Sequence, residues 1–507
     1  MSPVSRRALI IGGVALAALG AGSARPVDPF TLGVASGDPT PDGVVLWTRL
    51  APFPLAEDGL GGMPSRPVEV KWELALDERF RRVVRRGSEW ARPESGHSVH
   101  VDVAGLRPGC EYFYRFATDG YLSRTGRTRT APGPWTLTSP LTLAVASCAQ
   151  YEHGYFTAYR RLAEDEPDLV LHLGDYQYEY EKGVHVAPGG NVREVDGPRT
   201  VTLANYRQRY AQYKSDPDLQ AAHAVAPWSV VWDDHEVDDN WAGAFYSKPE
   251  IPQPDFPKRR AAAAQAYYEN MPIRQAPRGV DLLLYRRIMW GQVATFHMLD
   301  TRQYRDDQAC GDGIKYCPER LEPTRTILGA EQEAWLLDGF RNSTARWDVL
   351  GQQVFFSQYD HTSGPQQDTN LDAWDGYAAN RDRVVAGFPL VRNAVVLTGD
   401  VHAAWGAEIK ERWDDPASRT AGTELAATSI TSGGDGSEDY PETPAWLAEN
   451  PHVKYFNNRR GYVRARVSAD AFHADFRGVD QVSRPGAPVS TKASFVIEDR
   501  VPGLHRV

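Results

Sequence analysis

The chain has 507 residues, which is too long for one compact core and favours two or more domains. Hydrophobic residues make up 42% of it and charged residues 24%, an ordinary globular composition. The formal net charge is −10 at pH 7, and this disfavours a nucleic-acid-binding role, because proteins that bind through counterion release are usually basic.

The first residues have the pattern of an export signal. Arg6 and Arg7 precede a weakly apolar run that reaches Gly20, and small residues follow it as far as Ala24. We interpret residues 1–24 as a twin-arginine signal peptide, with a membrane anchor as the alternative. The twin-arginine export machinery would then deliver a folded protein to the periplasm or the exterior. We expect no stable membrane span after cleavage, because no other stretch is apolar for long enough.

Residues 28–135 contain several short runs typical of β-strands, in which side chains alternate between apolar and polar or are rich in aromatic residues. These runs are 43–50, 68–74, 99–103 and 111–116. Turn-forming residues at 37–42 precede the first of them. The pattern predicts an N-terminal β-sandwich domain, with residues 131–134 as the linker that follows it.

From residue 140 to residue 507 the pattern changes to strands that alternate with helices. Short apolar runs are typical of strands buried on both faces, and they occupy 143–147, 169–173, 228–232, 347–351 and 394–398. Helical stretches such as 154–164 and 330–340 lie between them. We therefore predict an α/β domain whose ligand site lies beyond the carboxyl ends of its strands.

Groups able to bind metal ions follow four of these runs. In chain order they are Cys148, then Asp175 and Tyr178, then the segment 233–240 with Asp233, Asp234, His235, Glu236 and Asn240, and last Asp400 and His402. Each motif also has a simpler explanation. In the same chain order, these are a small buried cysteine, a helix N-cap, a solvated acidic loop and an exposed polar pair. Four such endings on one predicted rim of a sheet favour a metal centre instead.

The spacing within these motifs suits shared ligation. Asp175 and Tyr178 are three residues apart in a turn, and Asp400 and His402 are two apart in an extended segment, so each pair can face one way. A phenolate is a hard anionic ligand suited to ferric iron, whereas the thiolate of Cys148 is soft. The carboxylates of 233–240 would repel one another strongly without cations.

Together with the opening segment 30–39, these motifs resemble the PhoD-type alkaline phosphatase/phosphodiesterase family of the calcineurin-like metallophosphoesterase superfamily. The resemblance implies a two-sheet metallophosphoesterase sandwich flanked by helices, with an N-terminal fibronectin-III-like β-sandwich. It implies an alkaline phosphatase or phosphodiesterase that contains iron (Fe³⁺) and calcium. Residues 140–507 would form the catalytic domain, and a phosphate ester would be the substrate.

The resemblance also implies ligands, residue by residue. Cys148, Asp175, Tyr178 and His402 resemble the iron ligands, and Asp175 would bridge to a second site. Asp234 and Asp400 stand where the wider superfamily usually has Asn and His, and their oxygen atoms suit calcium better than zinc. Asn240 is a weaker ligand candidate.

These residues predict hydrolysis by a metal-bound hydroxide, without a covalent enzyme intermediate. His235 could protonate the leaving alkoxide, and a metal-ligand or a core role for it stays open. Arg302 and Arg305 could hold phosphate oxygens, and a surface salt bridge is the alternative for each. The alternative functions are a phospholipase D and a non-catalytic, metal-stabilised binding protein.

Cys310 and Cys317 bracket a turn-rich loop. In an oxidising compartment we expect them to form a disulfide, with a metal-binding pair as the alternative.

Overall fold

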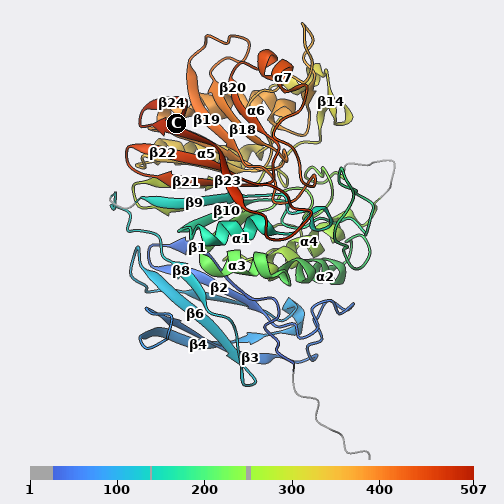
Figure 1. Ribbon diagram of the computed structural model, residues 1–507, viewed down its shortest axis with the longest axis vertical. Helices are drawn as coiled ribbons and strands as arrows, with labels where there is room; N and C mark the ends of the chain where they lie inside the picture. The colour runs from blue at the N-terminus through green and yellow to red at the C-terminus, as the bar shows by residue number, and fades with distance from the viewer. Residues whose placement is uncertain (1–26, 138–139, 247–252) are drawn as a thin grey trace, which may run out of the picture.

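The computed structural model describes residues 27–137, 140–246 and 253–507. Their strands form a ten-stranded sheet, a seven-stranded sheet, a five-stranded sheet and a short two-stranded pair (Figure 1). The expected signal peptide, 1–24, lies outside the described residues. Within the described ranges, no helix has both the length and the apolar character that a bilayer crossing requires.

The ten-stranded sheet carries three of the four predicted motif-bearing strands. Its order is β24 (Val501–Arg506), β23 (Val489–Glu498), β22 (Ala471–Val479), β21 (Gly461–Val467), β9 (Leu141–Ala146), β10 (Leu169–Leu173), β11 (Pro227–Val231), β1 (Val34–Thr40), β2 (Gly43–Arg49) and β5 (Ser98–Val103). The four strands from β9 to β1 are parallel. Every residue of β10 and β11 is buried, as expected for parallel strands covered on both faces.

The seven-stranded sheet carries the fourth motif, which follows β17. Its order is β12 (Arg286–Trp290), β13 (Ala294–Met298), β15 (Trp347–Gln352), β17 (Ala394–Thr398), β19 (Thr420–Ala426), β18 (Ala404–Lys410) and β20 (Val453–Asn457). The strands β13, β15, β17 and β19 are parallel to one another. Side chains of both large sheets, such as Leu171, Phe296 and Val395, share one hydrophobic core, and β10 packs against β15.

The N-terminal β-sandwich shares a sheet with the rest of the molecule. Its outer sheet contains β4 (Val83–Ala91), β3 (Val68–Ala75), β6 (Glu111–Thr118), β7 (Tyr121–Leu122) and β8 (Gly126–Arg129). Its other layer is β1, β2 and β5, and a separate hydrophobic core fills the space between the two layers. Because β1 pairs with β11 in parallel, this layer continues directly into the ten-stranded sheet.

Helices flank the sheets, as the family resemblance implied. They are α1 (Thr157–Glu164), α2 (Leu203–Lys214), α3 (Pro217–Val225), α4 (Phe256–Asn270), α5 (Gly329–Asn342), α6 (Ala378–Gly387) and α7 (Thr443–Glu449). The helix α2 begins with a reciprocal capping box between Thr202 and Asn205. The helix α3 begins at Pro217, and the side chain of the preceding residue, Asp216, caps it. These signals fix where the two helices start.

A disulfide joins Cys310 to Cys317, as the sequence predicted. The loop that it closes contains β14 (Ile314–Lys315), which pairs with β16 (Thr369–Asn370). Asp312 in this loop accepts a hydrogen bond from the side-chain amide of Asn240, at 2.9 Å. The disulfide loop therefore reaches one of the predicted ligand residues.

Candidate active site

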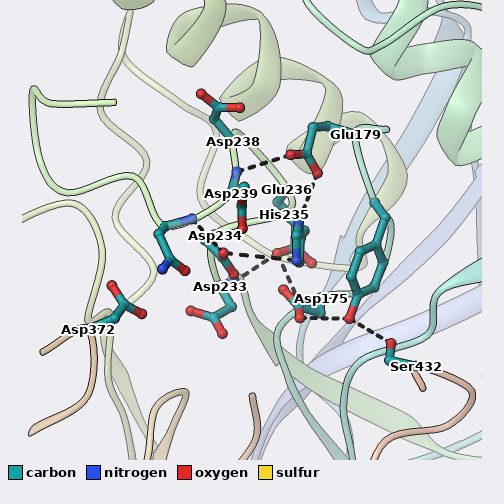
Figure 2. A network of polar contacts seen from close by, with 12 residues as sticks. Asp175, Glu179, Asp233, Asp234, His235, Glu236, Asp238, Asp239, Asp372 and Ser432 are labelled. Atoms are coloured by element: carbon teal, nitrogen blue, oxygen red, sulfur yellow. Dashed lines mark hydrogen bonds and ion pairs between the residues drawn. The ribbon is translucent and has the colours of Figure 1, made fainter. Parts of the chain in front are cut away.

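The four predicted motifs meet where parallel strands of the two large sheets end. Cys148 follows β9, Asp175 follows β10, Asp234 follows β11 and His402 follows β17. Donor atoms of Cys148, Asp175 and His402 all lie within 4.8 Å of one another. The same limit holds for Asp175 with Asp234 and His235, and for Asp234 with Asp233 and Asp400. These groups overlap at Asp175 and at Asp234, so they form one continuous cluster. Figure 2 shows the part of it around Asp175, Asp233, Asp234 and His235.

The backbone is strained at the predicted ligands. Positive φ angles occur at Cys148 (61°), Asp175 (54°), Asn240 (48°), Asp400 (58°) and His402 (50°). Residues with a Cβ rarely adopt this left-handed region, and non-glycine residues found there gather at functional sites. Five of the seven predicted metal ligands thus hold their side chains in a conformation that the surrounding fold must stabilise.

A buried carboxylate ties two of the loops together. Glu236 accepts hydrogen bonds from the backbone N–H groups of Asp175 (3.1 Å), Tyr176 (2.5 Å) and Asp233 (2.8 Å). Its side chain is fully buried, so these bonds are shielded from water. Glu236 therefore fixes the loop after β10 against the loop after β11.

Gly174 permits the close approach of the same two loops. Its φ is +104°, and a Cβ at this position would lie 2.4 Å from Cβ and 2.6 Å from the backbone nitrogen of Asp233. Backbone cannot yield to such a contact as a flexible side chain can. Only glycine fits here without displacing Asp233.

We expect Gly174→Ala to lower kcat/KM on p-nitrophenyl phosphate by about a hundredfold, because it displaces the loops that carry Asp175 and Asp234. It should also destabilise the fold by about 2 kcal/mol or more, measured by thermal denaturation. Gly120→Ala is the matched control: Gly120 also has a positive φ, but a Cβ there would have open space. Equal activity in the two variants would contradict the role assigned to the close contact between Gly174 and Asp233.

The Tyr178 hydroxyl lies within hydrogen-bond distance of three polar groups, although it has a single proton to donate. It lies 2.9 Å from Oδ2 of Asp175, 3.1 Å from Nε2 of His402 and 2.6 Å from Oγ of Ser432. Ser432 in turn donates to the backbone oxygen of Cys148, at 2.9 Å. Burial, followed by the charge of Asp175, raises the pKa of Tyr178 well above its usual value. A cation among these groups would stabilise the phenolate in place of the phenol.

The His235 imidazole is held by Glu179. Its Nδ1 lies 2.8 Å from Oε2 of Glu179, and its Nε2 lies 4.0 Å from Oδ2 of Asp234. The ring packs against Tyr178, with centroids 4.0 Å apart, and Tyr180 borders it edge-on. Burial acts to lower the pKa of His235, but Asp234, Glu179 and Asp175 raise it well above its usual value. One ring nitrogen is thus anchored while the other faces the carboxylate cluster (Figure 2).

Burial shifts the pKa values of most carboxyl groups in the cluster. Burial, partly offset by His235, raises the pKa of Asp175 well above its usual value, and burial followed by Asp233 does the same for Asp400. Burial also raises the pKa of Asp233 to about 7, against the effect of Arg302. At Asp234 the effect of burial is outweighed by His235 and Arg302, so its pKa is lowered.

Several atoms of this cluster are buried and have no hydrogen-bond partner among the described residues: Asp175 Oδ1, Asp233 Oδ2 and Asp234 Oδ1. Orphaned buried carboxylate oxygens are costly unless they are paired or bind a metal ion. Burial, followed by the charge of Asp175, also raises the pKa of the Cys148 thiol, and burial lowers the pKa of His402 to about 3. A neutral imidazole is the ligand form of histidine. The donor set and its unpaired oxygens therefore fit bound cations.

The predicted substrate-binding arginines are buried beside the cluster. Arg302 contacts Asp233 (Nε to Oδ1, 2.5 Å) and Asp372 (Nη1 to Oδ1, 2.8 Å), and Arg305 contacts Asp372 (Nη1 to Oδ1, 2.6 Å). Neither forms a surface salt bridge, because both side chains are fully buried. Substrate binding by these arginines stays a prediction. In the structure their guanidinium groups form ion pairs with Asp233 and Asp372.

Asn240 lies next to the cluster. Its backbone N–H donates to Oδ2 of Asp234 at 2.7 Å, while its side-chain amide donates to Asp312. The ligand role of Asn240 also stays a prediction.

Three contributors to this site were not identified from the sequence, namely Glu179, Asp372 and Ser432, and Glu236 was identified only as a group able to bind metal, not as the residue that joins the loops. Glu236 belongs to the acidic segment that the sequence singled out, and Glu179 directly follows Tyr178, so position next to a motif was a usable signal for both. Asp372 and Ser432 come from distant loops without a recognisable motif. Only the fold brings these two residues to the site.

The chain is similar to known proteins over most of its length. The profile of the PhoD-like phosphatase family matches residues 143–476, and that of the PhoD-like phosphatase N-terminal domain matches residues 15–132. Alkaline phosphatase D of Bacillus subtilis (strain 168) is 50% identical over 484 residues, covering 94% of this chain and 82% of that protein. The solved structure of PhoD superposes with a TM-score of 0.91 at 49% identity, covering 95% of this chain and 92% of that one. The chain therefore belongs to the PhoD-like phosphatase family and is a phosphoester hydrolase.

Proposed function

We propose that the protein is an exported hydrolase that depends on iron (Fe³⁺) and calcium and transfers the phosphoryl group to water without a covalent enzyme intermediate. One observation supports the metal dependence. The groups of donor atoms from four strand ends share Asp175 and Asp234, and carboxylate oxygens in these groups are buried without hydrogen-bond partners. Packing alone does not account for this convergence of four loops, since unpaired buried carboxylates destabilise a fold.

The donor chemistry divides into two parts. Cys148, Tyr178 and His402 supply sulfur, phenol oxygen and imidazole nitrogen, a set suited to ferric iron when Asp175 completes it. Asp234, Asp400 and Asn240 supply oxygen atoms, which calcium prefers. Asp175 lies within 4.8 Å of donors in both parts, as a bridging carboxylate requires.

When bound, these cations would neutralise phosphate oxygens and make a water molecule acidic enough to attack phosphorus. The side chains around the site position the ligand carboxylates and balance their negative charge. Arg302 offsets the charge of Asp233, and Asp372 holds Arg302 and Arg305 in place. We assign Asp233 and Arg302 a positioning role for Asp234, because Arg302 lies 3.8 Å from Oδ1 of that residue.

His235 is the proposed general acid. Glu179 holds its Nδ1 and favours the protonated ring, so a proton at Nε2 is available to the oxygen of the leaving alcohol. The packing of Tyr178 and Tyr180 against the ring limits its rotation. A fixed imidazole between a carboxylate and the substrate is the arrangement that proton transfer to a leaving group needs.

Location in the periplasm or outside the cell follows from the proposed twin-arginine signal. The disulfide between Cys310 and Cys317 supports an oxidising compartment, since such bonds are rare where thiols are kept reduced. The domain division at residues 28–135 and 140–507 is also proposed; the shared ten-stranded sheet implies that the two parts fold in contact.

Removal of metal ions tests this function. We expect chelation to lower activity on p-nitrophenyl phosphate and on its bis ester by at least about a hundredfold, and Fe³⁺ with Ca²⁺ to restore it. Metal analysis of the freshly purified protein should find both elements. Undiminished hydrolysis by a protein shown to be free of metal would contradict the proposal. Faster cleavage of phosphatidylcholine than of the small esters would instead favour a phospholipase D.

A further inference from the structure

A cavity lined partly by aromatic side chains adjoins the proposed metal centre. Its volume is about 310 Å³, and Asp400 and His402 line one part of it while Phe355, Tyr359 and Trp405 line another. This volume is at the lower end of the range found for small-molecule sites. A larger cavity of about 650 Å³ lies beside β12, but none of the candidate ligands lines it.

Three aromatic rings form a connected wall in this cavity. Trp405 of β18 lies 5.2 Å from Tyr359 and 5.8 Å from Phe355, measured between ring centroids. His361 lies edge-on to Tyr359 at 4.4 Å. Phe355, Tyr359 and Trp405 are each at least nine-tenths buried, so the wall belongs to a formed pocket and is not a flat surface patch.

The wall is held by contacts behind it. The backbone oxygen of Phe355 accepts from the backbone N–H of Trp374 at 3.2 Å, and the backbone N–H of Tyr359 donates to Asp375 at 2.8 Å. Asp375 is itself paired with Arg381 at 2.6 Å. The rings are therefore positioned before any ligand arrives, which lowers the entropy lost on binding.

The charge of the cavity excludes a second anion. None of the described residues that line it is a lysine or an arginine, and the lining carboxylate of Asp375 is already paired. Burial lowers the pKa of His361, so its ring is neutral near pH 7. Away from the proposed metal centre, the cavity offers uncharged aromatic surface with few polar groups.

We propose that this cavity binds the alcohol part of the phosphoester and selects for an uncharged ring in that part, through stacking on Tyr359 and Trp405. The inference rests on the proposed function, because the phosphate must occupy the adjoining centre of Asp400 and His402. A ring joined to the ester oxygen by a short linker would then lie against the aromatic wall, whereas a short alkyl group would leave the wall uncovered. Aromatic contacts of this kind add to the burial of apolar area.

The test compares ethyl, 2-cyclohexylethyl and 2-phenylethyl phosphates with the metal-loaded enzyme. All three release a primary alcohol, so their intrinsic reactivity is similar. We expect kcat/KM to be roughly tenfold or more higher for 2-phenylethyl than for ethyl phosphate, mainly through KM. Calorimetry should show the same order of affinity for ethylphosphonate and 2-phenylethylphosphonate, whose C–P bond is not hydrolysed. The cyclohexyl ester distinguishes stacking of a flat ring from simple apolar burial.

Tyr359→Ala should remove most of this preference while hydrolysis of ethyl phosphate continues, and Trp405→Phe should retain most of it. Trp90→Ala, on the exposed strand β4, is the control and should change neither. Equal kcat/KM for ethyl and 2-phenylethyl phosphate in the wild type would overturn the inference, as would an equal loss for both esters in Tyr359→Ala. No turnover of any ester with metals bound would instead contradict the proposed function.

Discussion

Asp175→Asn will lower kcat/KM by about a thousandfold or more at saturating Fe³⁺ and Ca²⁺. Asp175 is shared by two of the donor groups, and its Oδ1 is buried without a partner. An amide of the same shape brings no negative charge and one oxygen in place of two, so it binds two cations much more weakly than the carboxylate. Steady-state kinetics on p-nitrophenyl phosphate, together with metal content measured on the same sample, checks this result.

The appropriate control is Asp218→Asn in α3. Asp218 is a partly buried aspartate paired with Arg160 at 2.9 Å, and it is outside the metal cluster. Its substitution should leave kcat/KM within about twofold of the wild type, because such a pair contributes little. If Asp175→Asn retained both full activity and a full complement of metal, Asp175 could not be the bridging ligand.

His235→Gln should act selectively on substrates with poor leaving groups. An alkyl alkoxide needs a proton as it departs, whereas p-nitrophenolate is stable without one. We therefore expect kcat on ethyl phosphate to fall by about a thousandfold and kcat on p-nitrophenyl phosphate to fall by less than about tenfold. Metal content should stay unchanged. An equal loss on both substrates, accompanied by loss of metal, would show that His235 is a ligand and not the general acid.

The contact of Glu179 with His235 predicts how the rate depends on pH. Its charge helps raise the pKa of His235, so Glu179→Gln should lower that pKa and deplete the protonated ring at a lower pH than in the wild type. The alkaline limb of the rate profile on ethyl phosphate should then move to lower pH. The profile on p-nitrophenyl phosphate should move less, since it does not need the acid. An unchanged alkaline limb would contradict the role of Glu179.

Much of the fold was predictable because buried parallel strands are short, continuous apolar runs. The predicted run 169–173 coincides with β10, and 394–398 coincides with β17. The strand β1 was missed because Gly37, Asp38 and Pro39 read as a turn, although the strand runs on to Thr40 and pairs with β11. The strand β4 is mostly exposed and lacks clear alternation. Pairing with the distant strand β11 fixes β1, which no local pattern reveals, whereas β4 is fixed as the second strand of a hairpin with β3.

The site was predictable to the extent that its groups directly follow apolar strands. Cys148, Asp175, Asp234 and His402 do so, and the fold brings them together. Asp372 and Ser432 reach the site from loops whose course depends on the whole fold. The left-handed backbone at residues such as Cys148 was not predictable either, because local sequence preferences oppose that conformation.

The most direct test is a crystal structure of the metal-loaded protein with anomalous differences collected at the iron absorption edge. We predict an iron peak bound by Cys148, Tyr178 and His402, with Asp175 between it and a second, calcium-like peak near Asp234 and Asp400. Metal-loaded crystals that are active when dissolved, yet show no electron-dense peak in contact with Asp175, would contradict a shared metal centre.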